Sequence, residues 1–131
     1  MIDRSPNRAP DPLRGQIWEF DLNPKRGREQ RGIRPCLIVS TDALNRSTFG
    51  TVIVCPITTR ERPAFRWRPG LTPKDLEVVT REWKPRPHWV ATDQVVTVDV
   101  RQRALRHLAA VANEEKMLDV DDSLRMLLDL A

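Results

Sequence analysis

RGQIWEFDLNPKRGREQRGIRPCLIVS, residues 14–40, is the stretch of this chain that decides its fold. Two β-branched and aromatic runs within it, at 16–22 and 35–40, predict β-strands, and the segment between them predicts a connecting loop. From Lys25 to Arg34 this loop carries five cations against the single carboxylate of Glu29. Like charges repel one another unless an anion offsets them, so the loop is suited to bind an anionic partner.

Length and composition predict one domain, because 131 residues can bury a core without a metal or a disulfide. Residues 1–12 are rich in Pro, Arg and Asp and predict a flexible tail, which leaves residues 13–131 for the domain. No apolar run approaches the ~18 to 20 residues of a membrane span, and residues 1–13 lack the apolar core of a signal peptide. We expect a soluble cytoplasmic protein with no membrane partner.

The two cysteines, Cys36 and Cys55, each lie in a β-branched apolar run, with no His or Cys at ligand spacing. We expect two reduced thiols in the core, no metal site and no cofactor.

Charge is distributed unevenly along the chain. The net charge is +4 and the pI about 9.7, and four arginines between residues 60 and 68 face only one carboxylate, Glu61. Residues 114–131 invert this balance, with six carboxylates against two cations. A basic face predicts nucleic acid as the first candidate partner and an acidic peptide as the second, while a scattered excess of arginine serves solubility alone.

The remaining segments predict a mainly β fold with helices (α+β), a compact barrel of short strands. Strands are expected at 51–58, 89–98 and 107–112, and single helical turns at 42–47 and 101–105. Five prolines between residues 60 and 88 predict a long irregular excursion off the barrel. Asn113 is placed to cap a C-terminal amphipathic helix that packs on the barrel through Met117, Val120, Leu124, Leu127 and Leu128.

Four blocks in register carry a family resemblance: RGQIWEFDLNP (14–24), GREQRGIRP (27–35), VCPITT (54–59) and DQVVTVD (93–99). Over about residues 13–130 the chain resembles the MazF/PemK toxins of type II toxin–antitoxin pairs. The resemblance implies an SH3-like β-barrel homodimer. It also implies a metal-independent, sequence-selective endoribonuclease that cleaves single-stranded RNA (mRNA) and leaves a 2′,3′-cyclic phosphate and a 5′-hydroxyl. An antitoxin with an acidic C-terminal tail would occupy the same groove, and DNA would be bound only through the antitoxin complex.

The resemblance places the catalytic pair on Arg34 and Thr58; by its residue type alone Thr58 is only a β-former. A guanidinium can hold two phosphate oxygens, and a hydroxyl can donate one more hydrogen bond. Arginine is essentially never deprotonated, so Glu29 is the possible general base; it could instead pair with neighbouring arginines and shape the loop. The expected RNA contacts are Arg28, Gln30, Arg31, Gln94 and Trp67, whose ring could stack on an unpaired base.

Two positions depart from the family pattern. Arg28 stands where relatives have a small residue, and Val96 where they have an arginine. The tract 71–87 is long for the family and could set base preference. His88, between Pro87 and Trp89, is expected to serve packing or to face solvent rather than to act as acid or base.

Two other functions stay open: a non-enzymatic toxin of the same fold that poisons DNA gyrase, and an RNA-binding module without catalysis. The presence of both Arg34 and Thr58 favours the ribonuclease.

Overall fold

Alternation of side chains along the first two strands sets the architecture. In this computed structural model, which describes residues 11–23, 27–28 and 32–131, β1 (Gln16–Asp21) and β2 (Ile33–Ile38) form an antiparallel pair with Ile17 opposite Leu37 and Phe20 opposite Arg34. The other elements are α1 (Asp42–Asn45), β3 (Thr51–Thr58), β4 (Gly70–Leu71), η1 (Pro73–Asp75), β5 (Leu76–Val78), β6 (His88–Val90), η2 (Thr92–Gln94), β7 (Val96–Asp99), α2 (Val100–Arg103), β8 (Ala104–Val111) and α3 (Glu114–Leu127).

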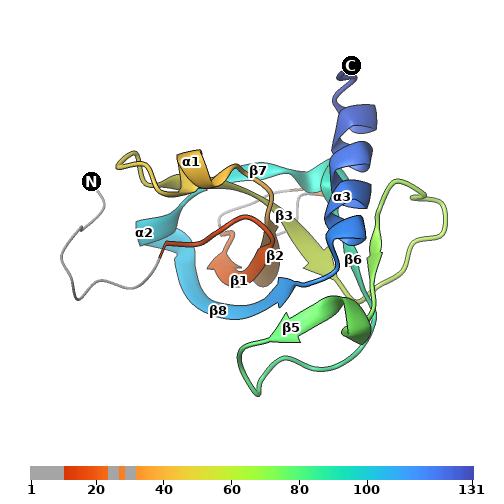
Figure 1. Cartoon of the computed structure of the whole chain (residues 1–131), viewed down its shortest axis with the longest axis horizontal. Coiled ribbons are helices and arrows are strands. Elements are labelled where there is room, and N and C mark those ends of the chain that lie inside the picture. Colours follow the sequence, from red (N-terminus) through yellow and green to blue (C-terminus); the bar gives the residue numbers. More distant parts are fainter. Residues whose placement is uncertain (1–10, 24–26, 29–31) are drawn as a thin grey trace.

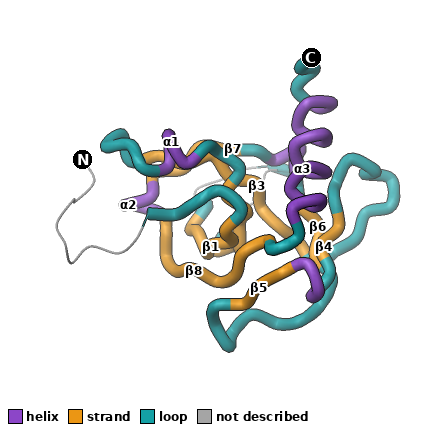
Figure 2. Tube along the Cα trace, viewed as in Figure 1, coloured by secondary structure: helices purple, strands orange, loops and turns teal. Residues whose placement is uncertain are grey.

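These strands form one strongly curved sheet in the order β4-β6-β3-β2-β1-β8-β5, with β7 paired to β3 (Figure 1 and Figure 2). The β1–β8 register shifts twice, between Ile17 and Trp18 and between Glu19 and Phe20. Such irregularities bend a strand and increase its twist, and β8 sweeps around β1 in Figure 1. The predicted mainly β, nearly closed barrel with a C-terminal helix is confirmed.

Apolar side chains on the two faces of the strands build two core clusters. The first contains Ile17, Leu37, Cys55, Ile57, Val90 and Val120 among others, and the second contains Phe20, Leu22, Cys36, Ile38, Val52, Val54 and Val98. Because successive side chains of a strand point to opposite faces, both faces of β1, β2 and β3 are covered.

The two cysteines lie in different clusters, Cys55 in the first and Cys36 in the second, and both are buried free thiols, as predicted. Burial is the main cause that raises the pKa of the Cys55 thiol to about 12, and burial likewise raises the pKa of Cys36. Both thiols are therefore protonated at neutral pH.

Two expectations about the middle of the chain are wrong. The tract between residues 60 and 88 is not an excursion off the barrel, because β4 and β5 pair with β6 and β8, and Leu71 and Trp83 are buried in the first cluster. The run 89–98 is not one strand, because the 3₁₀ turn η2 separates β6 from β7. Short strands of two or three residues have too little periodicity to be read from sequence.

Side-chain caps begin α1 and α3, and the cap of α3 at Asn113 was predicted. Thr41 accepts a hydrogen bond from the backbone N–H of Leu44 at the start of α1, and Asn113 accepts one from Glu115 at the start of α3. Within α3, Val120 is fully buried, and Met117 and Leu124 pack against the first cluster. The expected packing of Leu127 and Leu128 is wrong, since both are exposed on the end of α3 that projects from the barrel (Figure 1).

Polar contacts anchor α3 to the barrel. The Arg14 guanidinium lies 2.5 Å from the Asp121 carboxylate and also donates to the carbonyl of Val39. The hydroxyls of Ser123 and Thr92 are 2.8 Å apart, which joins α3 to η2. No described helix is both long and apolar enough to cross a membrane.

The two isoleucines of β2 provide a test of the core. Ile38 is fully buried whereas Ile33 is 58% exposed. We predict that Ile38→Ala lowers the free energy of unfolding by about 2–5 kcal/mol because it leaves a cavity, and that Ile33→Ala changes it by less than about 0.5 kcal/mol. Urea denaturation monitored by tryptophan fluorescence measures both, and equal losses would contradict this account of the core.

Candidate nucleic-acid interface

Arg34 lies near the start of β2, with an exposed side chain opposite the buried Phe20 of β1. The paired part of the β2–β3 ladder ends at Cys36–Pro56. If the same register is continued by two residues on each strand, Arg34 lies opposite Thr58 at the end of β3. Both side chains then project from the same face, since residues directly opposite one another in an antiparallel pair share a face.

Thr58 ends β3 opposite Trp89 of β6 and is partly exposed. Its hydroxyl oxygen accepts a hydrogen bond from the backbone N–H of Arg60 at 3.1 Å. This contact uses one lone pair of the oxygen and leaves the hydroxyl hydrogen able to donate. Among the described residues, no group accepts a hydrogen bond from the Thr58 hydroxyl. The local turn thus holds a donor at the end of the sheet.

The loop between β1 and β2 is tied down at its base. The Leu22 N–H donates to the Gly32 carbonyl at 2.9 Å, and the Gly32 N–H donates to the Asn23 side chain at 3.1 Å. Gly27 and Gly32 have φ of +64° and +82°, a region that disfavours residues with a Cβ. Arg28 is exposed.

Three of the predicted site residues, Glu29, Gln30 and Arg31, lie outside the described residues.

Gln94, on η2, lies beside this loop. Its side-chain amide donates to the carbonyl of Arg28 at 3.4 Å, across 66 positions of sequence. Two residues predicted separately as RNA contacts are therefore neighbours. Val96 of β7 is the position where the family pattern has an arginine. It lies opposite Val54 of β3 and packs against the second cluster. Burying a charged side chain there would cost free energy.

An ion pair that the sequence did not suggest holds η2 in place. The Arg68 guanidinium donates to both carboxylate oxygens of Asp93, at 2.7 and 2.9 Å, and its side chain is only 6% exposed. Burial would raise the pKa of Asp93, but the hydrogen bonds to its carboxylate, those from Arg68 first among them, together outweigh burial, and the pKa is lowered. Arg68 therefore does not add to the basic face, and no local pattern could have paired residues 25 positions apart.

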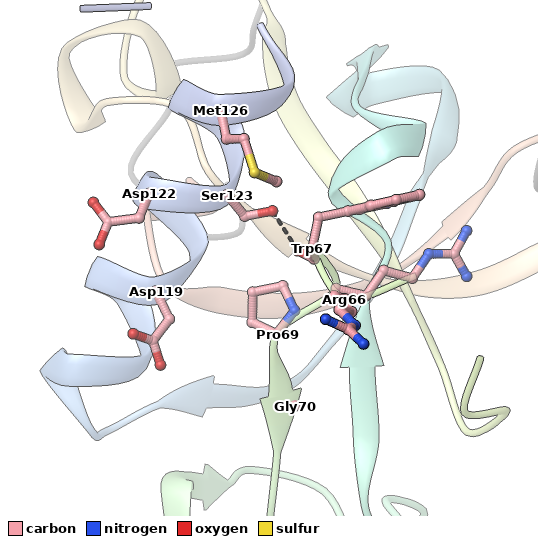
Figure 3. A pocket seen from close by; sticks show the side chains of 9 residues that line it. Arg66, Trp67, Pro69, Gly70, Asp119, Asp122, Ser123 and Met126 are labelled. Carbon is pink, nitrogen blue, oxygen red and sulfur yellow. Dashed lines mark hydrogen bonds between the residues drawn. The ribbon is translucent and has the colours of Figure 1, made fainter. Parts of the chain in front are cut away.

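Trp67 lies in a hollow of about 450 Å³ between α3 and residues 66–70 (Figure 3). Its ring stacks on Phe65, with centroids 5.0 Å apart, and its buried Nε1 forms no hydrogen bond of normal geometry. The Ser123 hydroxyl donates to the Trp67 carbonyl, whereas Asp119 and Asp122 project from α3 on the other side of the view. One face of the indole is thus already covered, and neither Arg34 nor Thr58 lines this hollow.

Within the described part of the chain, no three His, Cys, Asp or Glu side chains are grouped closely enough to hold a metal ion.

Comparison with known proteins gives consistent matches. Residues 13–128 match the family model described as PemK-like, MazF-like toxin of type II toxin–antitoxin system. The structure is similar to MazF from Deinococcus radiodurans, with TM-score 0.70 and 25% identity over 93% of this chain and all of the other. It is also similar to a MazE–MazF complex from that organism (TM-score 0.68, 26% identity, 92% and 98% coverage) and to an endoribonuclease from a mycobacterial species (0.61, 25%, 92% and 94%).

The Arg68–Asp93 pair makes stability depend on pH. Because the folded pKa of Asp93 is lowered, the stabilisation is present above the unfolded pKa and is lost as pH falls through the folded one. We predict that Asp93→Asn lowers the free energy of unfolding by about 1–3 kcal/mol at pH 7, and that the difference from wild type shrinks as pH falls below about 4. The control is Asp122→Asn, which breaks an ion pair whose side chains are 55% and 72% exposed and should cost less than about 1 kcal/mol. Urea titrations at several pH values would refute the assignment if the two variants behaved alike.

Proposed function

This chain belongs to the family of PemK-like, MazF-like toxins of type II toxin–antitoxin systems, and on that basis we propose that it is an endoribonuclease acting on single-stranded RNA. The observation that carries the proposal is the placement of Arg34 and Thr58 at the same end of neighbouring strands, next to a loop rich in cations. The similar mycobacterial protein that is named an endoribonuclease supports it.

Cleavage without a metal is chemically accessible because RNA carries its own nucleophile. The 2′-hydroxyl attacks the adjacent phosphorus in line, the 5′-oxygen leaves, and the products are a 2′,3′-cyclic phosphate and a 5′-hydroxyl. The protein has to align these atoms and stabilise the charge that develops on the phosphate oxygens. In our proposal the Arg34 guanidinium binds two of those oxygens and the Thr58 hydroxyl donates to the same group.

Proton transfer needs a separate group, since arginine does not deprotonate in proteins. A carboxylate can accept the proton of the 2′-hydroxyl, and we propose Glu29 for this role. The loop that carries it is held at its base by contacts of Gly32, and at Arg28 by Gln94. Gln94 and the loop residues Arg28, Gln30 and Arg31 would then contact the RNA next to the cleaved phosphate and contribute sequence selectivity.

The partners follow from the charge of the chain. We propose that a cognate antitoxin silences the enzyme by laying an acidic segment across the same basic surface in the cytoplasm, and that DNA is bound only through that complex. The net charge of +4 and the cations of the β1–β2 loop support this pairing. The similarity to a MazE–MazF complex supports an antitoxin partner of this kind.

We also propose a homodimer, formed in part by the projecting end of α3. Five large apolar side chains of this region are exposed: Leu118, Met126, Leu127, Leu128 and Leu130. Such an apolar group is unfavourable in water and marks an interaction surface.

Removal of the catalytic pair tests the ribonuclease. We predict that Arg34→Ala lowers the rate of RNA cleavage about 10²- to 10³-fold, because it removes the charge that stabilises the transition state. Thr58→Val, which keeps the shape, should cost about 10- to 100-fold. Lys74→Ala is the control, since it removes an exposed cation of η1. Cleavage of a long RNA is followed in EDTA, with the new ends mapped by their chemistry.

The outcomes separate the candidate functions. Uncut RNA with tight binding would indicate an RNA-binding module, and toxicity that survives both Arg34→Ala and Thr58→Val would indicate a non-enzymatic toxin such as a gyrase poison. Cleavage abolished by EDTA and restored by a divalent metal would overturn the metal-independent mechanism.

A charge placed on α3 tests the dimer. We predict that wild type has twice the 15.1 kDa chain mass in multi-angle light scattering, and that Leu128→Glu raises the dimer dissociation constant at least tenfold because it buries a charge in the interface. Lys74→Glu introduces the same residue at an exposed position of η1, away from α3, and should leave the mass unchanged. A dimer unaffected by Leu128→Glu would exclude this face.

A further inference from the structure

A second hollow, of about 270 Å³, lies on the other side of the sheet end from Arg34 and Thr58. Pro35 of β2 and Thr59, just after the end of β3, both line it and directly follow Arg34 and Thr58 in sequence. Successive residues of a strand point to opposite faces, so this hollow begins within one residue of the proposed catalytic pair. A strand of RNA that bends around the end of the sheet would reach both.

His88, which lines the hollow, carries a polar atom that no described residue uses. His88 is 6% exposed and its ring stacks on Trp83 at 4.5 Å. Its Nδ1 lies 2.8 Å from the Arg86 carbonyl, which can only accept, so Nδ1 carries the proton. Burial lowers the pKa of His88, so the ring is neutral at pH 7 and Nε2 is an acceptor. No described residue donates a hydrogen bond to Nε2.

Charge around the hollow is positive. The carboxylates of Glu19 and Glu82 both pair with Arg106, and with Lys84 and Arg86 the lining has three cations against two carboxylates, a net charge of +1. Lys84 and Arg86 also line the hollow, are exposed, and form no ion pair with a described carboxylate. The rim therefore suits an anion, while the Nε2 acceptor of His88 suits a group with an N–H or O–H donor.

A nucleotide combines these two requirements. Its phosphate is anionic and its base has donor groups on an otherwise flat, apolar ring. The volume falls just below the ~300–1,000 Å³ of pockets that hold drug-sized ligands, so it suits one base and not two. An acidic peptide also has anions for Lys84 and Arg86 and backbone N–H donors for His88, so it is the position of the hollow beside the proposed catalytic pair that favours RNA.

We propose that this hollow is a nucleotide subsite of the RNA groove, in which His88 Nε2 accepts a hydrogen bond from the base next to the cleaved phosphate and Lys84 and Arg86 hold the backbone. The inference rests on the proposed ribonuclease function for the identity of the ligand. It assigns to the tract 71–87 and His88 a direct share in selecting the RNA sequence.

Binding of uncleavable RNA tests the subsite independently of catalysis. The probe is a 2′-O-methyl RNA of mixed sequence, with affinity measured between 50 and 300 mM salt by fluorescence anisotropy. Each phosphate contact on a single strand contributes about 0.7 to the slope of log K against log[salt]. We expect Lys84→Ala/Arg86→Ala to reduce that slope by about 1.4 and the control Lys74→Ala/Arg125→Ala to leave it unchanged. An unchanged slope in both double variants overturns the subsite.

Substitution of His88 tests the base contact. We expect His88→Phe, which keeps an aromatic ring but removes the acceptor, to weaken binding about 3- to 10-fold and to relax the base preference at one position beside the cut. His88→Gln retains an acceptor and should restore most of that preference. Equal preference in wild type and both variants refutes the contact.

The two proposals can fail separately. RNA cleavage with an unchanged salt slope would leave the ribonuclease and remove the subsite. RNA that is bound through Lys84 and Arg86 but not cut would support the subsite and contradict the ribonuclease. Binding of an acidic peptide that depends on Lys84 and Arg86 but not on His88, with no such dependence for RNA, would assign the hollow to the antitoxin instead.

Discussion

The pairing of β1 with β2 on one side and with β8 on the other is the constraint on which the rest of the structure depends. It buries Ile17 and Phe20 in different clusters, so one short strand contributes to the core on both faces. The same pairing places Arg34 opposite the fully buried Phe20, which fixes the backbone that carries the proposed phosphate-binding group. Preorganisation of this kind is what a charge-stabilising group requires.

The basic surface is smaller and more structured than the count of cations suggests. Arg68 forms an ion pair with Asp93, Arg106 with Glu19 and Glu82, and Arg14 with Asp121. These pairs hold η2, β8 and α3 against the barrel. The exposed cations that line or flank the two proposed RNA contacts, Arg28, Arg34, Lys84 and Arg86, are contributed by segments far apart in the chain.

The proposed groove consequently has two sides of different character. On one face of the sheet end, Arg34 and Thr58 offer charge and a hydroxyl donor suited to any phosphate. On the other, the stacked rings of His88 and Trp83 form a wall with an acceptor at His88 Nε2, and a base edge with a donor at that point can be distinguished from one without it. The proposed catalytic pair and the proposed base contact of His88 thus lie on opposite faces of the sheet end.

The sequence by itself determined most of β1, β2 and β3, the cap of α3, the two free thiols and the family, because periodicity, capping residues and motif order are local properties of the chain. It placed Arg34 and Thr58 at strand ends and Arg28 in a loop by the same means. Only the tertiary structure decided that Leu71 and Trp83 belong to the core, that Gln94 contacts Arg28, and that Asp93 neutralises Arg68. These contacts involve segments at least 25 residues apart or strands of only two or three residues. No local pattern predicts them, because the curvature of the sheet brings the segments together.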